Sequence, residues 1–365
     1  MKRFLFKLIM LLIYIAAVQF ALPVIVDPFN VFHTENIRDT GSEPNKHYVK
    51  MRYILNNPSK FDSFIFGSSR VGAIHTEKIT GEKCYNMTYS AGVPSEHLGD
   101  LKIMLNNNVC PKKIYVAVDS VSYTSNIHDH ISEALRCPYE YLVDNNGMIN
   151  LHFINLYYDI GIVLGGLKVM LKNYLRPINT KYKFDAKIFY EYGWSTPHSY
   201  YDYEVTYDWE TEIRKVLNNT SKASYYESMM ATLQDIRDIK KLCDENHIEL
   251  IVFTNPVHYI GHIQASDIHY SEFLKGIVEI TDFYNFSGLN DITLNNKNYL
   301  DMGHYKAIVG DMLIDVICNG KKFEKLYEQG FGIKINRDNI DELLGLLKRQ
   351  WEDYKENKLH QENFL

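Results

Sequence analysis

The sequence predicts an α/β domain on a mostly parallel sheet of about five strands, preceded by a membrane-spanning helix. Three observations support this prediction: apolar runs that alternate with helical stretches, polar residues where the runs end, and a long apolar segment at the N-terminus. Strands that alternate with helices favour parallel βαβ units. Apolar strands with little alternation are typical of a sheet covered on both faces. We therefore expect a three-layer α/β/α sandwich.

The expected strands are short runs rich in β-branched and aromatic residues, which favour extended backbone. In chain order they occupy residues 62–66, 83–89, 113–118, 248–253 and 282–286. The expected helices have apolar side chains at helical spacing, which places those side chains on one face. They occupy residues 95–106, 224–246, 271–280 and 304–318.

The N-terminal segment has the composition of a signal anchor. Basic residues at positions 2, 3 and 7 precede Leu8 to Val26, in which Gln19 is the only strongly polar side chain. A membrane span needs about 20 such residues, and residues 17–23 make a poor cleavage site. We expect an uncleaved transmembrane helix over residues 1–26, with the rest of the chain outside the cytoplasm because the positive charges precede the span. A cleaved signal or a buried helix is the alternative.

Composition excludes several classes of function. The 365 residues carry a net charge of -6, which argues against electrostatic binding of nucleic acid. Five scattered cysteines without a CxxC pair argue against a disulfide framework and a zinc cluster, and they leave one bridge or buried free thiols as options. Metal-ligand spacing and a Gly-rich phosphate loop are both absent from the sequence. We therefore expect neither a metal nor a cofactor.

The chain divides into four predicted parts. The membrane-spanning helix spans residues 1–26, a linker with a short helix near residues 48–55 spans 27–60, the main domain spans 61–320, and an amphipathic helical tail spans 321–365. Within the main domain, residues 125–222 interrupt the strand–helix alternation with a helical run and a tyrosine-rich stretch. We interpret this segment as an insertion that caps one edge of the sheet; irregular surface structure is the alternative.

Polar residues with catalytic potential follow the predicted strands. Ligand sites of open parallel sheets form at the carboxyl ends of the strands, where Ser69 follows the first strand in a tight turn that would expose its hydroxyl. Asp301 and His304 are three residues apart ahead of a helix. That spacing lets the carboxylate reach the imidazole Nδ1, fix its tautomer and stabilise the imidazolium. A helix after Ser69 would direct N–H groups toward developing negative charge.

Gly67-Ser68-Ser69 and the later Asp301-x-x-His304 together resemble the SGNH (GDSL-like) hydrolase superfamily. The resemblance is to membrane-anchored bacterial members with Gly-Ser-Ser in place of Gly-Asp-Ser, such as D-alanine transfer proteins of teichoic acids and acetyltransferases of exopolysaccharides. It covers roughly residues 60–125 and 225–318. It implies a flavodoxin-like SGNH fold in which Ser69 is the nucleophile, His304 the general base and Asp301 its orienting partner.

The resemblance also indicates an oxyanion hole, and here the sequence departs from the family. A backbone N–H after the second strand would come from Ala91 or Gly92. The family's asparagine in the third block is replaced by Asp119 or Ser120, and an ionised Asp119 would repel an oxyanion. Arg70 is expected either to bind a substrate carboxylate or phosphate or to form a surface salt bridge.

These features predict an extracytoplasmic serine esterase or O-acyltransferase of cell-envelope glycans. Ser69 would form an acyl-enzyme and pass the acyl group to water or to a sugar hydroxyl. The expected partners are an acylated glycan or acyl donor, the membrane, and a membrane acyltransferase or polysaccharide-assembly protein. The alternative is a catalytically degenerate module that binds glycan or a membrane partner, since the Asp119 departure would suit it.

Overall fold

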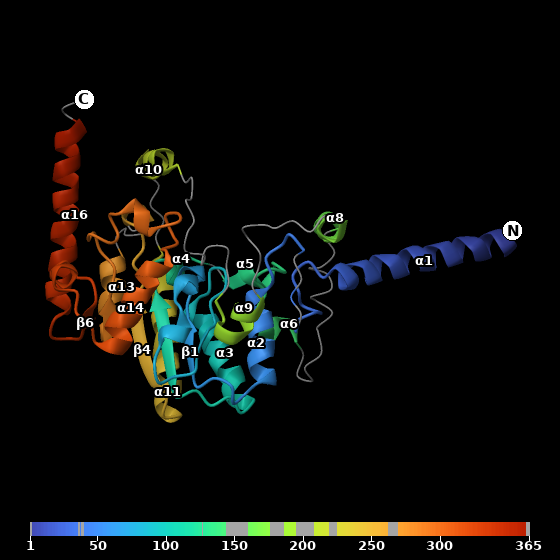
Figure 1. Ribbon diagram of the computed structural model, residues 1–365, viewed down its shortest axis with the longest axis horizontal. Helices are drawn as coiled ribbons and strands as arrows, with labels where there is room; N and C mark the ends of the chain where they lie inside the picture. The colour runs from blue at the N-terminus through green and yellow to red at the C-terminus, as the bar shows by residue number, and fades with distance from the viewer. Residues whose placement is uncertain are drawn as a thin grey trace. The chain divides into compact units, whose positions relative to one another are not determined.

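A computed structural model describes the fold over most of the chain (Figure 1). The described residues are 2–35, 37, 40–125, 127–143, 160–175, 186–194, 208–218, 225–261 and 269–362. They form two compact units. One combines Met1–Tyr53 with Ile127–Ala186, and the other combines Ile54–Asn126 with Lys187–Leu365.

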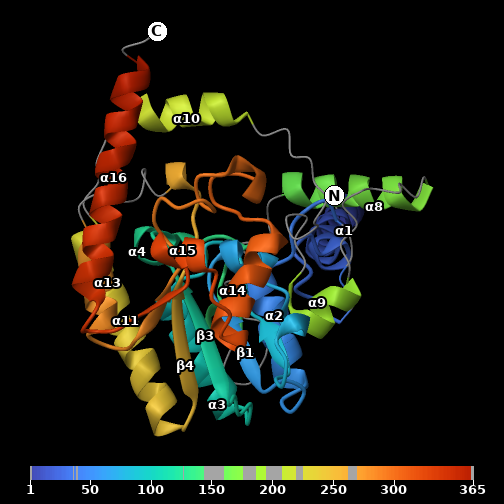
Figure 2. The same cartoon turned by 60° about the vertical axis from the view of Figure 1, so that its left-hand side comes forward.

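The second unit is an α/β domain on a mixed six-stranded sheet (Figures 1 and 2). Its strands are β1 Ser63–Phe66, β2 Cys84–Asn86, β3 Lys113–Val118, β4 Glu249–Thr254, β5 Phe283–Asn285 and β6 Ile333–Ile335, in the order β2-β1-β3-β4-β5-β6. The first five strands are parallel, and β6 pairs antiparallel with β5. The predicted α/β class and the five parallel strands are confirmed, and the sixth strand is an addition.

The helices of this unit include counterparts of the four predicted to alternate with the strands. They are α3 Pro94–Asn106, α4 Val121–Thr124, α9 Ala186–Tyr192, α10 Trp209–Asn218, α11 Tyr226–Glu245, α13 Tyr270–Val278, α14 Ala307–Asn319, α15 Glu324–Glu328 and α16 Ile340–Glu362. Three short 3-10 turns complete the described set: η1 Ser69–Ala73, η2 Thr76–Lys78 and η4 Asn296–Asn298.

The core lies against the central strands. Ile65, Tyr115 and Phe253, from β1, β3 and β4, belong to one buried cluster with Val309 and Leu313 of α14. Because Phe64 and Phe66, which alternate with Ile65 along β1, are also buried, this strand has apolar contacts on both faces. That double burial explains why the strands read as continuous apolar runs.

The direction of winding reverses between β1 and β3. From β1 the chain first crosses to β2 on one side, and the next strand, β3, lies on the other side of β1. A doubly wound sheet binds its ligands at such a reversal, outside the carboxyl ends of the two strands. Ser69 and Asp119 follow β1 and β3 at this position.

The end of the predicted insertion lies along the edge strand β2. Tyr85 donates its hydroxyl proton to the Phe189 carbonyl of α9 at 3.0 Å. Gly193 follows α9 with a φ of 78°, and a Cβ there would lie 2.2 Å from the Asn86 carbonyl oxygen. The chain can therefore approach the backbone of β2 this closely only with glycine. Most of the tyrosine-rich stretch, residues 195–207, lies outside the described residues.

The predicted tail both extends the sheet and ends in a helix. Gly330 and Gly332 have φ angles of 88° and 81°, and the Gly332 N–H donates to the Asn285 carbonyl at 2.6 Å. This left-handed backbone turns the chain so that β6 runs antiparallel to β5. The expected amphipathic helix is α16, which buries Ile340 and Leu343.

The first unit joins the N-terminal segment to the earlier part of the insertion. Its helices are α1 Lys2–Val26, α5 Ile127–Ile131, α6 Tyr139–Leu142 and α8 Ile160–Leu175, together with most of α2 Lys46–Asn56. The Asn45 side chain donates to the carbonyls of Ala134 and Cys137 at 2.9 and 3.0 Å. These bonds tie the linker to residues far along the sequence.

Helix α1 is the one helix of the described residues that is long and apolar enough to cross a membrane. Most of its side chains are exposed, and only Pro23 and Val26 are buried. It is therefore not a core helix of this chain. A signal sequence near the N-terminus has the same properties. All five cysteines are free, so the single bridge left open by the sequence is not formed.

Candidate active site at the carboxyl end of the sheet

Ser69 lies in a tight turn directly after β1. A Cβ on Gly67 would lie 3.0 Å from Ala117 Cβ and 3.1 Å from both Val71 γ-methyl carbons, so the turn needs glycine to pack this closely. Ser68 is extended, and its Oγ accepts a 3.5 Å hydrogen bond from the Arg70 N–H. Ser69 then begins η1, which has five residues. The helix expected after Ser69 is therefore only a short 3-10 turn, and no appreciable helix dipole acts there.

The last residue of β2 and the loop after it fix this turn. The buried Asn86 amide donates to the Val71 and Ile74 carbonyls at 2.8 and 3.3 Å, and the Thr88 hydroxyl donates to the Ser68 carbonyl at 2.8 Å. Because Asn86 takes up carbonyls at the end of η1, the turn does not continue as a helix. Asn86 and Thr88 thus position Ser69 without touching it.

His304 lies in a loop closed by two buried tyrosines. Tyr299 and Tyr305 form an isolated antiparallel bridge, and the Leu300 N–H donates to the His304 carbonyl at 2.9 Å. The Tyr299 hydroxyl donates to the Pro256 carbonyl at 2.7 Å. The Tyr305 hydroxyl donates to Asn255 at 3.3 Å, so both ends of the loop are held to the segment that follows β4.

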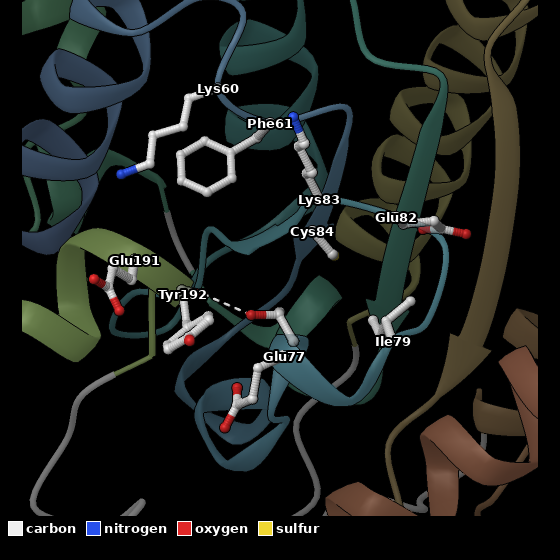
Figure 3. Close-up of a pocket in the computed structure, with 10 residues that line it drawn as sticks. Lys60, Phe61, Glu77, Ile79, Glu82, Lys83, Cys84, Glu191 and Tyr192 are labelled. Atoms are coloured by element: carbon white, nitrogen blue, oxygen red, sulfur yellow. Dashed lines mark hydrogen bonds between the residues drawn. The ribbon is translucent and has the colours of Figure 1, made fainter.

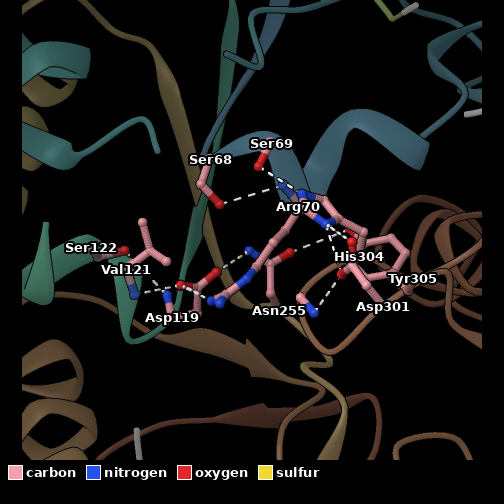
Figure 4. Close-up of polar contacts among 11 residues, drawn as sticks. Ser68, Ser69, Arg70, Asp119, Val121, Ser122, Asn255, Asp301, His304 and Tyr305 are labelled. Atoms are coloured by element: carbon pink, nitrogen blue, oxygen red, sulfur yellow. Dashed lines mark hydrogen bonds and ion pairs between the residues drawn. The ribbon is translucent and has the colours of Figure 1, made fainter. Parts of the chain in front are cut away.

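Ser69, His304 and Asp301 meet as a hydrogen-bonded triad (Figure 4). Ser69 Oγ lies 2.9 Å from His304 Nε2, and His304 Nδ1 lies 2.8 and 2.9 Å from the two Asp301 carboxylate oxygens. The Asp301 Oδ1 atom also accepts the N–H groups of Gly303 and His304, each at 2.8 Å. All three side chains predicted from the sequence are thus brought together from segments 235 residues apart.

The charge state of Asp301 fixes the histidine tautomer. Burial alone would raise the pKa of the Asp301 carboxyl, but its bonds with His304 and with two N–H groups outweigh burial and lower the pKa to about 2. An ionised carboxylate only accepts, so Nδ1 of His304 carries a proton and Nε2 of the neutral ring accepts the Ser69 proton. This is the arrangement in which an imidazole can deprotonate a serine hydroxyl.

Helix α14 holds the His304 loop against the Ser69 turn. A Cβ on Gly310 would lie 2.4 Å from the Ala73 carbonyl oxygen. Because Gly310 has no side chain, α14 can contact the end of η1 directly. This contact sets how close the two halves of the triad can lie.

Arg70 and Asp119 form a largely buried ion pair beside the triad (Figure 4). The Asp119 carboxylate accepts from Arg70 Nη1, from the Val121 N–H at 2.7 Å and from the Asn255 amide at 2.7 Å. Asn255 Oδ1 in turn accepts from the Tyr305 hydroxyl at 3.3 Å. Arg70 is therefore an internal partner of Asp119 rather than the surface salt bridge considered from the sequence.

Asn255 is a residue of this network to which sequence reasoning gave no role. It is 1% exposed and follows β4, so it reaches Asp119 from the strand next to β3. Its contacts join Asp119 to Tyr305 and hence to the His304 loop. The only sequence signal was its place at a strand end.

The remaining predicted residues are Ala91, Gly92 and Ser120. Ala91 has a φ of 57°, and a Cβ on Gly92 would lie 2.8 Å from the Gly67 carbonyl oxygen. The Gly92 backbone is thus close to the residues that precede Ser69. Ser120 precedes α4 as its N-cap without a side-chain cap bond, and within the described part of the chain its hydroxyl makes no hydrogen bond with the triad.

His258, in the segment after β4, is buried outside the triad. Its Nε2 lies 2.9 Å from Asn296 Oδ1, and its ring lies 4.3 Å from the Trp209 ring. Burial lowers the pKa of His258 to about 4, although Asn296 and Asp301 oppose that effect. The ring is therefore neutral near pH 7.

A separate cavity of about 430 Å³ lies at the amino ends of β1 and β2, whereas the triad lies at the carboxyl end of the sheet (Figure 3). It is lined by Phe61, Cys84 and Tyr192 among others. Its Glu82 carboxylate accepts hydrogen bonds from Lys113 and from the Tyr115 hydroxyl, so these polar groups are bonded to one another. The described residues contain no group of three or more His, Cys, Asp or Glu side chains placed to hold a metal.

Comparison of the chain with family models, curated proteins and solved structures yields no match. The function is therefore inferred from the site, from α1 and from the resemblance noted in the sequence.

Proposed function

We propose that this chain is a membrane-anchored serine esterase or O-acyltransferase of the SGNH type. The observation that carries the proposal is the 2.9 Å contact between Ser69 Oγ and His304 Nε2, with Asp301 behind the ring. Both His304 and Asp301 side chains keep about a quarter of their surface accessible, at 26% and 30%. The triad is thus still open to a substrate.

The chemistry proceeds through two acyl transfers. His304 Nε2 takes the Ser69 proton as Oγ attacks an ester carbonyl, and the imidazolium then protonates the leaving alcohol as the ester C–O bond breaks. The product is an acyl-enzyme on Ser69. In the second half, His304 deprotonates water or a sugar hydroxyl, which attacks the acyl group and releases Ser69.

The ionised Asp301 supports both steps. Because its pKa is lowered to about 2, it stays negative at neutral pH and stabilises the imidazolium that forms in each half-reaction. It also holds the ring orientation through Nδ1.

The oxyanion would be stabilised by the backbone N–H groups of Ser69 and Gly92. Neither N–H has a hydrogen-bond acceptor among the described residues, and donors of this kind are worth several kcal/mol to the transition state. The concern that Asp119 would repel an oxyanion is reduced by Arg70, since the pair carries no net charge. Asp119 and Ser120 thus take no direct catalytic part in this proposal.

The fold supports the SGNH resemblance at the level of strand order. The five parallel strands have the order β2-β1-β3-β4-β5, which is that of doubly wound, flavodoxin-like sheets. The three-layer SGNH arrangement is part of the proposal.

The location and substrate follow from α1 and from the family resemblance. We propose that α1 is an uncleaved anchor, with Lys2, Arg3 and Lys7 on the cytoplasmic side. The domain would then act outside the cytoplasm on acyl groups of envelope glycans. An acyl donor, an acylated glycan and a membrane acyltransferase or assembly protein are the proposed partners.

A fluorophosphonate probe tests the enzyme against the alternative of a degenerate binding module. We expect labelling of the full-length protein in detergent and its loss in Ser69→Ala and in His304→Ala. Ser68→Ala is the matched control, because the adjacent hydroxyl makes only a 3.5 Å cap bond, and this variant should label like the parent. A folded protein that resists the probe would favour the binding module and refute the enzyme.

A further inference from the structure

Helix α8 exposes an apolar stripe to its surroundings. Leu164, Leu171 and Leu175 are 52%, 52% and 74% exposed, and Ile160 at the start of the helix is 55% exposed. With the half-buried Leu167, these side chains recur every three to four residues and share one helix face. A stripe of this kind on the surface of a water-soluble domain is unusual and marks an interaction surface.

A different face of α8 packs on the last turn of α1. A Cβ on Gly166 would lie 2.9 Å from Val26 Cγ1, so the two helices touch at this glycine. On the same unit, a Cβ on Gly41 would lie 2.7 Å from Val169 Cγ2. Val163 is 1% exposed. The packing face is therefore occupied within the chain, whereas the stripe is not covered by any described residue.

The direction of α8 suits the surface of a membrane. Figures 1 and 2 show α8 lying across the end of α1 rather than alongside it. A helix that lies across a spanning helix runs along the membrane plane. With 16 residues, α8 is about 24 Å long, too short to cross a hydrocarbon core of about 30 Å.

The polar residues of α8 match a lipid interface. Lys168 and Lys172 are exposed and lie beside the stripe, where lysine stems can extend along apolar surface while the charges reach headgroups. Tyr174 is 84% exposed, and tyrosine is enriched at membrane interfaces. An apolar face with lysines along its edge is typical of an interfacial helix.

We infer that α8 is an interfacial helix that lies in the membrane that α1 enters. Its leucine stripe is immersed at the acyl boundary, and its two lysines contact anionic headgroups. The helix thus gives the chain a second membrane contact beside the span. This inference requires α1 to be inserted, but it does not depend on the chemistry of Ser69.

Depth-dependent quenching of single labels tests the inference on the full-length protein. Cys110 and Cys318 are replaced by serine, which leaves the buried Cys84, Cys137 and Cys243. An environment-sensitive dye is then attached to Leu171→Cys in liposomes that contain anionic lipid and lipids brominated along the acyl chain.

Gly165→Cys is the matched control on the same helix. It lies about 100° around the helix from Leu164, and a Cβ there meets nothing within 4 Å. A label at Phe20→Cys on α1, whose side chain is 58% exposed, reports insertion of the span.

We expect strong quenching at Phe20, and quenching at Leu171 about threefold greater than at Gly165, because an interfacial helix immerses one face by about 5–10 Å. Equal quenching at Leu171 and Gly165, or none at Leu171 while Phe20 is quenched, would overturn the inference. The second of these outcomes would instead indicate a protein partner for the stripe. Loss of quenching at Phe20 would overturn it as well. None of these readouts changes with Ser69→Ala, so failure here is distinguishable from failure of the proposed enzyme.

Discussion

Replacing Gly310 by alanine should separate His304 from Ser69 without altering either residue. Gly310 lies on α14, six residues after His304, where the helix contacts the end of η1. The added Cβ would lie 2.4 Å from the Ala73 carbonyl oxygen and 3.0 Å from its carbon. Ordinary contacts of a Cβ begin near 3.4 Å, so the helix must move away by about 1 Å.

The size of the effect follows from that displacement. A misplacement of about 1 Å in a reacting pair lowers the rate by roughly 100-fold. Overpacking of a close contact costs about 1–3 kcal/mol of unfolding free energy. The variant should therefore remain folded but react with a fluorophosphonate probe about 100 times more slowly.

The assay is the second-order rate of probe labelling, measured well below the melting temperature of each variant. Gly345→Ala is the control, since its nearest neighbour is the end of the flexible Arg349 side chain at 3.4 Å. It should label like the parent protein. A folded Gly310→Ala protein that labels at the parental rate would refute the idea that α14 sets the distance between Ser69 and His304.

Three further predictions concern the groups around the triad. Asp301→Asn should slow labelling by roughly 1,000- to 10,000-fold, because the amide no longer holds the required His304 tautomer; a parental rate would contradict the role of Asp301. Arg70→Met should lower the free energy of unfolding, measured by chemical denaturation, by about 3–5 kcal/mol because Asp119 is left charged and buried. Adding Asp119→Leu should recover most of that loss. Equal losses in the single and double variants would contradict the pairing of Arg70 with Asp119. Burial lowers the pKa of His258 from 6.5 to about 4, so His258 gains its proton at a higher pH in the unfolded chain than in the folded one. The free energy of unfolding should therefore fall as the pH drops from about 6.5 to 4, by roughly 3 kcal/mol in total. His258→Gln should remove this part of the pH dependence, and an unchanged slope would show that other groups cause it.

The parallel strands could be predicted because their signal is local. The run Lys113 to Val118 matches β3 from end to end, since β-branched and aromatic residues between polar boundaries favour a buried strand. β6 could not be predicted in the same way. It has three residues, and it follows two glycines whose positive φ angles turn the chain back toward β5. Only pairing with β5 makes that short segment a strand.

The turn after Ser69 shows where a local pattern misleads. The sequence favoured a helix there, but the Asn86 side chain bonds the Val71 and Ile74 carbonyls and η1 ends after five residues. A side-chain contact from the next strand decided the outcome. The local sequence contains no sign of it.

The residues of the candidate site also differ in whether local sequence or long-range contacts identify them. Ser69, Asp301 and His304 could be proposed because strand ends and short spacing identify them. The roles of Asn86, Thr88 and Asn255 depend on contacts between segments far apart in the chain, which one sequence does not reveal. Asp119 was recognised as a departure, but its pairing with Arg70 became visible only in three dimensions.

The most direct test of the central claim is to find the acyl group itself. Full-length protein is mixed with 4-nitrophenyl acetate, the release of nitrophenol is followed on the millisecond scale, and the acetylated peptide is identified by mass spectrometry. We predict a burst of one nitrophenol per protein, with the acetyl group on Ser69, and no burst in Ser69→Ala. A natively folded protein that shows no burst, or that carries the acetyl group only on other residues, would contradict the account.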